Sequence, residues 1–544
     1  MFVYLYYIAL AILSFVVVVI GSGAVAFLFA WLGLSLTLVS SAYLLKNPSI
    51  FRKNSDGSIP FIISLVLLPF IVGVHLYNII ATWFDKTDRI HHINHGVHVG
   101  RRLNSSDLLT LEELNINAIV DMTAEFSALN WSASAMELDY FNIPVLDHQS
   151  PKEEELRQAI TWIDNQVTRD RKVVVHCALG RGRSVFVVAA YMLAKSPDLS
   201  VREVLENITK IRSFAKLNRS QMKRLVEYHQ QNKIYINEEA CLIANPVSGG
   251  GKWLTSKELV IDQLSRHFKL IVHETTLEQS ASDFAKQAIN NNIKTIIAAG
   301  GDGTLREVAE HLVNTDTLFG VIPLGTANAL AHHLYGNLSK IDPVGTAMSH
   351  IVSKNCEKID TASCNNQTVL LLVGIGLEHE MISYADRDNK NNSGQFAYLE
   401  GFFRGFADGK SYPLKVKFDQ EAEQEINCTS FVVANAAPFT SLLAQGNGSP
   451  DFTDGLLDVT WIKPTADTTS KLVDFAELVS ASFNLRQGNE LPNEQGNINA
   501  TLAKKVTVTS DKAISYVIDG EVFEEQSVCI ESNPESLNVF INKS

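Results

Sequence analysis

The sequence predicts a membrane-anchored multidomain protein, with N-terminal transmembrane helices followed by two α/β units. Three observations predict this class. Residues 1–45 carry no charged side chain. Short apolar runs alternate with amphipathic stretches from about residue 90, which is the pattern of strands and helices in turn, and a second such series starts at Ala240. The length of 544 residues fits roughly three globular units.

The composition limits which partners the protein is expected to bind and in which cellular compartment it is expected to lie. The formal net charge is −13, which argues against a nucleic-acid binder because phosphate backbones attract basic surfaces. The cysteines are scattered without a CxxC pair, so we expect reduced thiols, as in the cytosol. They are Cys177, Cys241, Cys356, Cys364, Cys428 and Cys529.

Residues 1–84 form the predicted membrane region, with two to three helices. The uncharged stretch is long enough for two passes of about twenty residues each, with a turn at Gly21-Ser22-Gly23. Residues 60–84 are a third apolar run that contains Pro69, and basic residues flank this run on both sides. Since basic residues favour the cytoplasmic face, either the run returns at Pro69 or the rule fails at one flank.

The first α/β unit contains a cysteine at the start of a glycine-containing loop. The sequence His176-Cys-Ala-Leu-Gly-Arg-Gly-Arg-Ser184 follows a buried strand and precedes a helix. Backbone N–H groups at such a helix start bind anions and would stabilise the thiolate of Cys177. The fork of Arg183 suits two phosphate oxygens. Together these residues predict thiolate attack on a phosphomonoester, whereas the cysteine alone would be interpreted as a buried structural thiol.

Residues 90–235 resemble the dual-specificity branch of the protein tyrosine phosphatases. Besides the loop, His98-Val-Gly100 resembles the opening strand of that family, and Asp121-Met-Thr-Ala-Glu125 resembles an early strand end. The resemblance implies that Cys177 is the nucleophile, Arg183 the phosphate clamp, Asp147 the general acid and then base, and Ser184 the group that helps the thiolate leave. The implied phosphate-binding loop is Ala178, Leu179, Gly180, Arg181 and Gly182. Family members act on phosphoproteins or phospholipids, and Arg181 together with the membrane region favours a lipid.

Three glycine-containing loops follow strands in the second series. They are Asn245-Pro-Val-Ser-Gly-Gly-Gly251, Gly300-Gly-Asp-Gly-Thr304 and Pro323-Leu-Gly-Thr-Ala-Asn328. No Walker loop is present. Loops at the carboxyl ends of parallel strands meet at one crevice, so they predict a nucleotide site.

Two acidic clusters lie further along, at Asp451 to Asp458 and at Asp519-Gly-Glu521. Acidic groups in phosphoryl transfer hold Mg²⁺ or accept the hydroxyl proton. Either cluster alone could equally be a β-turn.

Residues 240–544 resemble the diacylglycerol kinase catalytic family, because the three loops and both acidic clusters occur in the family's order. The resemblance implies an α/β nucleotide lobe over 238–365, a β-sandwich lobe over 366–544, and ATP as substrate between them. It implies that Glu521, with Asp519, accepts the proton of a lipid hydroxyl, and that Mg²⁺ lies near Asp451, Asp454 and the Leu456 carbonyl. The implied ATP-binding residues are Asn245, Thr275, Gly300, Gly301, Asp302, Gly303, Thr304, Glu307, Gly325, Thr326 and Asn328.

The second series departs from the family pattern at Ala329, Arg306 and Glu378, where many members have Asp, Asn and Asp. These departures concern the acceptor lipid more than the binding of ATP.

The leading hypothesis is an integral membrane enzyme with both catalytic domains in the cytoplasm. Its kinase half phosphorylates a diacylglycerol-like lipid, and its phosphatase half acts on another phospholipid or a phosphoprotein. The alternative is a phosphoprotein phosphatase whose kinase-like domain senses lipid or nucleotide. The oligomeric state is not predicted.

Overall fold

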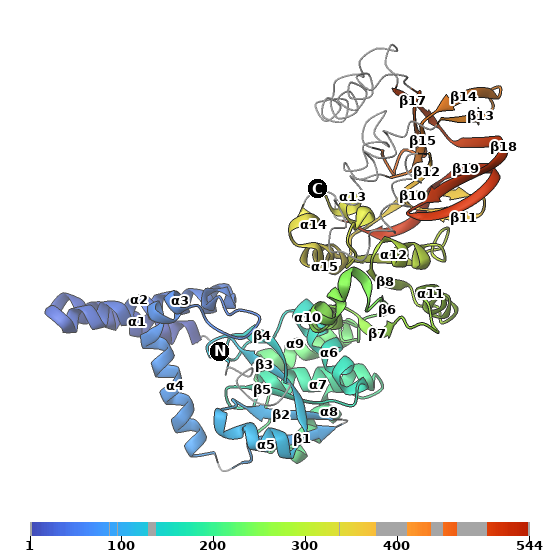
Figure 1. Cartoon of the computed structure of the whole chain (residues 1–544). Coiled ribbons are helices and arrows are strands. Elements are labelled where there is room, and N and C mark those ends of the chain that lie inside the picture. The colour runs from blue at the N-terminus through green and yellow to red at the C-terminus, as the bar shows by residue number, and fades with distance from the viewer. Residues whose placement is uncertain are drawn as a thin grey trace. The chain divides into compact units, whose positions relative to one another are not determined.

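The computed structural model describes residues 3–85, 87–94, 96–128, 138–336, 338–376, 411–436, 450–464 and 498–541. The chain divides into two compact units (Figure 1). The first comprises Met1–Glu238 with Ser265–Lys269, and the second comprises Glu239–Leu264 with Leu270–Ser544. The predicted membrane region and the first α/β domain thus belong to one unit.

The N-terminal segment is helical. Helix α1 (Val3–Ile20) and helix α2 (Gly23–Leu45) are each long and apolar enough to cross a membrane. The Ser40 hydroxyl near the end of α2 donates to the Tyr4 carbonyl at the start of α1, at 3.0 Å, so the two helices form an antiparallel hairpin. The turn falls at Gly21-Ser22, as predicted.

The third apolar run forms two helices, α3 (Phe61–Val66) and α4 (Leu68–Trp83), with the short 3₁₀ helix η1 (Pro48–Phe51) before them. Pro69 occupies the first turn of α4, a position that proline tolerates because the first N–H groups of a helix need no internal acceptor. The run is therefore interrupted at Leu67. Helix α4 has 16 residues, so it is shorter than a typical span.

The α/β domain of the first unit has a five-stranded sheet in the order β1-β2-β5-β3-β4. Strands β2, β5, β3 and β4 are parallel neighbours, and β1 pairs antiparallel with β2. The sheet is buried, and Val173 and Val175 on β5 are inaccessible to solvent. The strands are β1 (Ile90–Asn94), β2 (Val97–Arg101), β3 (Ile116–Thr123), β4 (Asp139–Val145) and β5 (Lys172–Cys177). The helices are η2 (Ser105–Asp107), α5 (Leu108–Glu113), α6 (Glu153–Thr168), α7 (Arg183–Lys195), α8 (Val201–Ile211) and α9 (Arg219–Gln230).

The second unit begins as an α/β lobe whose strands β6, β8 and β9 are parallel. Each of these strands ends in one of the glycine loops. The strands are β6 (Glu239–Ala244), β7 (Lys269–Glu274), β8 (Thr295–Gly300) and β9 (Leu318–Pro323). The helices are η4 (Ser248–Gly250), α10 (Lys252–His267), α11 (Ala281–Asn290), α12 (Asp302–Ala309), α13 (Ala329–Tyr335), α14 (Leu338–Ile341) and α15 (Pro343–Ser353).

The rest of the second unit consists of antiparallel strands around a separate apolar core. The long strand β19 connects the lobes, because its end pairs parallel with β9 through Asn538 and Val539. The strands are β10 (Cys356–Cys364), β11 (Gln367–Val369), β12 (Leu372–Gly376), β13 (Tyr412–Phe418), β14 (Gln424–Cys428), β15 (Ser430–Ala434), β16 (Leu457–Ile462), β17 (Ile498–Ala503), β18 (Lys505–Ile518) and β19 (Glu521–Phe540).

Candidate active sites

The cysteine loop joins the end of β5 to the start of α7, as the sequence predicts. Cys177 is 3% exposed, and its Sγ lies 3.4 Å from the Ser184 Oγ. Gly180 has φ +65°, and a Cβ there would lie 2.6 Å from the Gly100 carbonyl oxygen. A residue with a side chain therefore does not fit at this position.

Side chains from outside the cysteine loop donate hydrogen bonds to its carbonyl groups. The Asn78 Nδ2 on α4 donates to the Ala178 oxygen at 3.0 Å. The Arg212 guanidinium donates to the oxygens of Leu179 and Gly180, at 3.3 and 2.7 Å. None of the backbone N–H groups of residues 178–182 donates a hydrogen bond within the described part of the chain. Because these donors follow one another at a helix start, they form a cradle for an anion.

Arg183 is buried beneath this loop with most of its donors in use. Its Nη1 and Nη2 bind the two oxygens of Glu125 at 2.9 and 2.7 Å, and Nη1 also donates to the Val145 oxygen at 2.7 Å. Its Nε has no partner among the described residues. Burial would lower the pKa of Arg183, but the carboxylates of Glu125 and Asp147 hold it well above its usual value. The Nε–Nη2 edge thus contains the one guanidinium nitrogen that has no partner among the described residues, and Nε is free to bind a phosphate oxygen.

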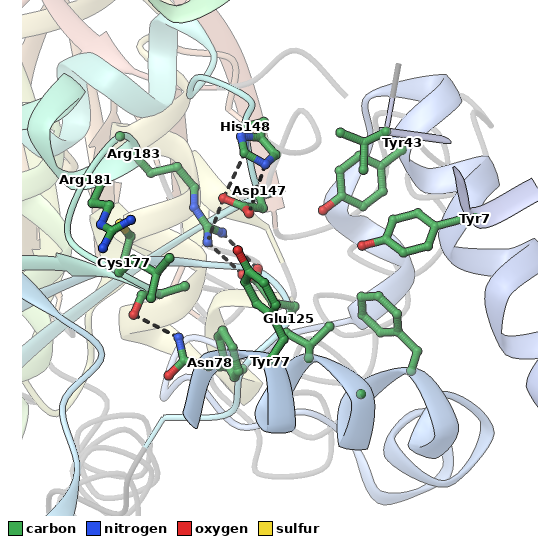
Figure 2. Close-up of a pocket in the computed structure, with 18 of the residues that line it drawn as sticks. Tyr7, Tyr43, Tyr77, Asn78, Glu125, Asp147, His148, Cys177, Arg181 and Arg183 are labelled. Carbon is green, nitrogen blue, oxygen red and sulfur yellow. Dashed lines mark hydrogen bonds and ion pairs between the residues drawn. The ribbon is translucent and has the colours of Figure 1, made fainter. Parts of the chain in front are cut away.

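Asp147 follows β4 and lies beside the same edge (Figure 2). Its Oδ1 is 3.3 Å from the Arg183 Nη2, and its side chain is 45% exposed. Burial raises the pKa of Asp147, but the charges of Arg183 and His148 and a backbone N–H outweigh burial and lower it below its usual value. A bound phosphate would offset the Arg183 charge and so favour the protonated form of Asp147.

Three contacts at this site were missed by the sequence analysis. Glu125 appeared there only as part of a strand end, although it fixes Arg183. Arg212 and Asn78 support the loop from positions 32 and 100 residues distant from their acceptors. No local pattern in the sequence marks such pairs.

The three glycine loops of the second unit pack against one another. A Cβ on Gly249 would lie 2.0 Å from the Leu324 oxygen, and one on Gly325 would lie 2.6 Å from the Gly301 Cα. The Gly301 N–H donates to the Ser248 Oγ at 3.0 Å. The loops therefore approach so closely that only glycine fits at these positions.

Side chains on and beside the loops reinforce this arrangement, and all of them except Lys252 belong to residues predicted to bind ATP. Asn245 Nδ2 donates to the Thr304 Oγ1 at 3.0 Å, and the Lys252 ammonium donates to the Gly325 oxygen at 2.8 Å. Asn328 has φ +51°, and its buried Oδ1 has no partner among the described residues. Asp302 accepts from the N–H groups of Ala329 and Leu330, both at 3.1 Å.

The other residues predicted for ATP lie on or near the same loops. Gly300 ends β8, Gly303 and Glu307 lie on α12, Thr326 is exposed in the third loop, and the Thr275 N–H donates to the Ala244 oxygen.

The predicted proton acceptors have different surroundings. Asp519 accepts from the N–H groups of Leu370, Leu371 and Leu372 at 2.7 to 2.9 Å, so its oxygens hold a backbone turn. Burial raises the pKa of Asp519 to about 6, although these N–H groups and Arg306 act against the increase. Glu521 is 51% exposed and forms an ion pair with Arg306. Arg306, which departs from the family pattern, thus contacts Glu521, one of the predicted catalytic groups.

The predicted metal residues lie on the turn before β16. Asp451 Oδ1 accepts from the Thr453 N–H at 2.9 Å, and Asp454 Oδ1 accepts from the Leu456 N–H at 2.8 Å. Burial, with Asp454 and Asp451 nearby, raises the pKa of Asp458 to about 7. Negative charge is therefore concentrated at this turn, and oxygen donors suit Mg²⁺. The described residues contain no group of three or more His, Cys, Asp or Glu side chains placed to hold a metal ion, and Glu378 lies outside the described residues.

Two parts of the chain match known protein families. Residues 97–231 match the family described as dual specificity phosphatase, catalytic domain, and residues 239–364 match the diacylglycerol kinase catalytic domain. The chain therefore contains a dual specificity phosphatase catalytic domain and a diacylglycerol kinase catalytic domain. The predicted fold class and the prediction of an enzyme are thereby confirmed, with the phosphatase domain in the first unit and the kinase domain in the second.

Individual relatives resemble the chain over about half its length. An uncharacterized protein of Synechocystis is 33% identical over 310 residues, which is 55% of this chain and 69% of that protein. A diacylglycerol kinase of Bacillus subtilis is 26% identical over 288 residues, covering 52% of this chain and 90% of the kinase. A crystal structure of a putative diacylglycerol kinase from Bacillus anthracis is 20% identical, covers 56% of this chain and 95% of that chain, and has a TM-score of 0.44.

Proposed function

We propose that the protein is a bifunctional membrane enzyme. Its kinase domain transfers phosphate from ATP to a lipid hydroxyl, with diacylglycerol as the expected acceptor. Its phosphatase domain hydrolyses a phosphomonoester through a cysteinyl-phosphate. The second activity rests on one observation: among the described residues, neither the Nε of buried Arg183, beside Cys177, nor the N–H groups of the loop have a hydrogen-bond partner.

The phosphatase residues have complementary roles in the proposed reaction. The Cys177 thiolate attacks phosphorus while the loop N–H groups and the Nε–Nη2 edge of Arg183 bind the phosphate oxygens. Asp147 protonates the leaving oxygen, and then accepts a proton from the water that hydrolyses the intermediate. Ser184, whose hydroxyl lies 3.4 Å from the sulfur, stabilises the thiolate as it leaves.

The kinase proposal assigns the ATP phosphates to the three glycine loops. Their close packing supports a shared phosphate site, since backbone N–H groups at strand ends and helix starts favour anions. Glu521 accepts the proton of the lipid hydroxyl, and Arg306 holds its carboxylate in place. Asp451, Asp454 and the Leu456 carbonyl would hold Mg²⁺, which supplies positive charge to the phosphate oxygens.

The membrane assignment depends on α1 and α2. Their length and apolar composition support two spans, and if both helices cross the membrane, an antiparallel hairpin has both ends on one side. ATP and a reactive thiolate both favour the cytoplasm for the catalytic domains. The expected partners are membrane lipids, with no nucleic acid.

The kinase proposal is tested by transfer of labelled γ-phosphate from ATP into lipid by the full-length protein in nanodiscs. A Cys177→Ser background prevents the phosphatase from removing the product. We expect labelled lipid, and a loss of about 10²-fold or more with Glu521→Gln because a general base contributes that much. If no lipid in a broad extract is labelled, the kinase proposal is wrong.

The ion pair of Glu521 with Arg306 favours a second candidate function, in which the kinase-like domain binds lipid or nucleotide and regulates a phosphoprotein phosphatase. In that case Glu521→Gln would leave the biological activity intact, whereas Cys177→Ser would abolish it.

A further inference from the structure

A large cavity connects the cysteine loop with the N-terminal helices. Its volume is about 1030 Å³, at the upper end of the range of roughly 300–1,000 Å³ that is typical of small-molecule sites. Cys177, Arg183 and Asp147 line one end, and helices α1, α2 and α4 line the other (Figure 2). All of these residues belong to the first unit.

The helical walls of the cavity are apolar and regularly spaced. Helix α1 contributes Tyr7 and Leu10, α2 contributes Leu32 and Leu36, and α4 contributes Phe70 and Val74. A spacing of three or four residues places each pair on one face of its helix. The cavity is therefore amphipathic, with a phosphate cradle at one end and hydrocarbon walls at the other.

The helices are attached to the catalytic domain by specific polar contacts. The Lys53 ammonium, between η1 and α3, donates to the Asp121 carboxylate at 2.8 Å and to the Thr123 oxygen at 2.7 Å. Both Lys53 and Asp121 are buried. The Asn78 side chain connects α4 to the phosphate loop. These contacts thus fix the position of the apolar walls relative to the catalytic loop.

We infer that the phosphatase site takes a long-chain lipid phosphomonoester whose hydrocarbon chain lies between α1, α2 and α4. This inference rests on the proposed phosphatase function and names its substrate class. The apolar walls belong to helices of which two are long enough to span a bilayer, so the hydrocarbon chain of a lipid can stay in an apolar environment while its phosphate reaches the polar end at Cys177. A phosphopeptide would leave its backbone polar groups unpaired against these walls, which is costly.

Gly73 on α4 provides a direct test. It lines the cavity, and a Cβ there would meet no atom of the described residues within 4 Å, so a side chain can be added at this position and Gly73→Phe is designed to occupy the cavity. The substitution also removes a glycine from a helix interior, which favours the helix. Val72→Phe is the matched control, because Val72 is exposed on the same helix and does not line the cavity.

The measured quantity is the ratio of two hydrolysis rates by the full-length protein in nanodiscs: that of a long-chain lipid phosphomonoester in the bilayer and that of a small soluble aryl phosphate. Gly73→Phe is expected to lower this ratio by about tenfold or more, because the ring would occupy space in which methylene groups of the lipid chain are otherwise buried. Val72→Phe is expected to leave the ratio unchanged. An unchanged ratio in Gly73→Phe would overturn the inference, as would faster cleavage of phosphopeptides than of lipid by the wild type.

A second measurement needs no variant. For soluble alkyl phosphates, kcat/KM of the wild-type protein is expected to rise by about tenfold or more as the chain grows by several methylenes. A flat dependence on chain length would contradict the inference while cleavage of the aryl phosphate continued. Absence of aryl phosphate hydrolysis would instead show that the proposed phosphatase function has failed.

Discussion

At the scale of residues, the phosphatase site depends on which donor groups of Arg183 bind the protein and which remain for the substrate. Glu125 accepts from Nη1 and Nη2, whereas Nε has no partner among the described residues and is left for the phosphate. A charge-assisted pair of this kind fixes the guanidinium plane. The clamp is thus oriented before any phosphate binds.

The Glu125→Gln variant tests this orientation. We expect kcat/KM for a soluble aryl phosphate to fall by about 10- to 100-fold, because hydrogen bonds to charged groups contribute roughly 1.5–3 kcal/mol. Glu206→Gln, which removes an exposed ion pair on α8, is the control and should leave the rate unchanged. Steady-state kinetics checks both, and an unaltered kcat/KM in Glu125→Gln would show that Arg183 needs no such support.

Asp147 determines the expected pH dependence of the phosphatase. It donates a proton only when protonated, and its pKa is lowered despite burial, by Arg183, His148 and a backbone N–H. The rate therefore falls as pH rises through this pKa, and the optimum is acidic. With an alkyl phosphate, Asp147→Asn should lower kcat by about 10²–10⁴-fold and remove the alkaline limb of the pH–rate profile. If that limb persists in the variant, another group is the acid.

At the scale of elements, the segment between α2 and α3 fixes the helical hairpin to β3. The Asp121 carboxylate accepts from Lys53, Tyr140 and Thr123. Burial would raise the pKa of Asp121, but Lys53, His176 and the hydrogen bond from Thr123 lower it far below its usual value. Because the folded-state pKa is depressed, this stabilisation is present above the unfolded pKa of about 3.9 and is lost as pH falls towards the folded value.

Lys53→Met should destabilise the protein by about 3–5 kcal/mol, because it leaves a buried carboxylate without its partner. Adding Asp121→Asn should restore part of the stability by removing the unpaired charge. Thermal unfolding of the detergent-solubilised protein checks the pair of variants. Equal melting temperatures for wild type and Lys53→Met would mean that the ion pair does not support this docking.

The elements themselves could largely be predicted from the sequence. The strand before Cys177 and the three strand–loop–helix units of the kinase lobe follow from short apolar runs ending in glycine loops. Contacts between distant residues could not be predicted, since Glu125–Arg183 and Arg306–Glu521 join positions 58 and 215 residues apart. The three N–H groups that bind Asp519 likewise depend on a turn that no local pattern specifies.

At the scale of the whole molecule, one chain contains a kinase domain and a phosphatase domain. In our proposal the kinase domain adds a phosphate to a hydroxyl, and the phosphatase domain removes one. If both acted on the same compound, ATP would be consumed without net product. We therefore expect the two domains to act on different substrates, or one to regulate the other.

A crossed assay of four proteins in nanodiscs tests the central claim most directly. Wild type, Cys177→Ser, Glu521→Gln and the double variant are each measured for label transfer from ATP to lipid and for hydrolysis of a lipid phosphomonoester. Our account predicts that Cys177→Ser abolishes only the hydrolysis, that Glu521→Gln abolishes only the transfer, and that the double variant lacks both. A wild-type protein without either activity, or a single substitution that abolishes both, would contradict the existence of two independent active sites on this chain.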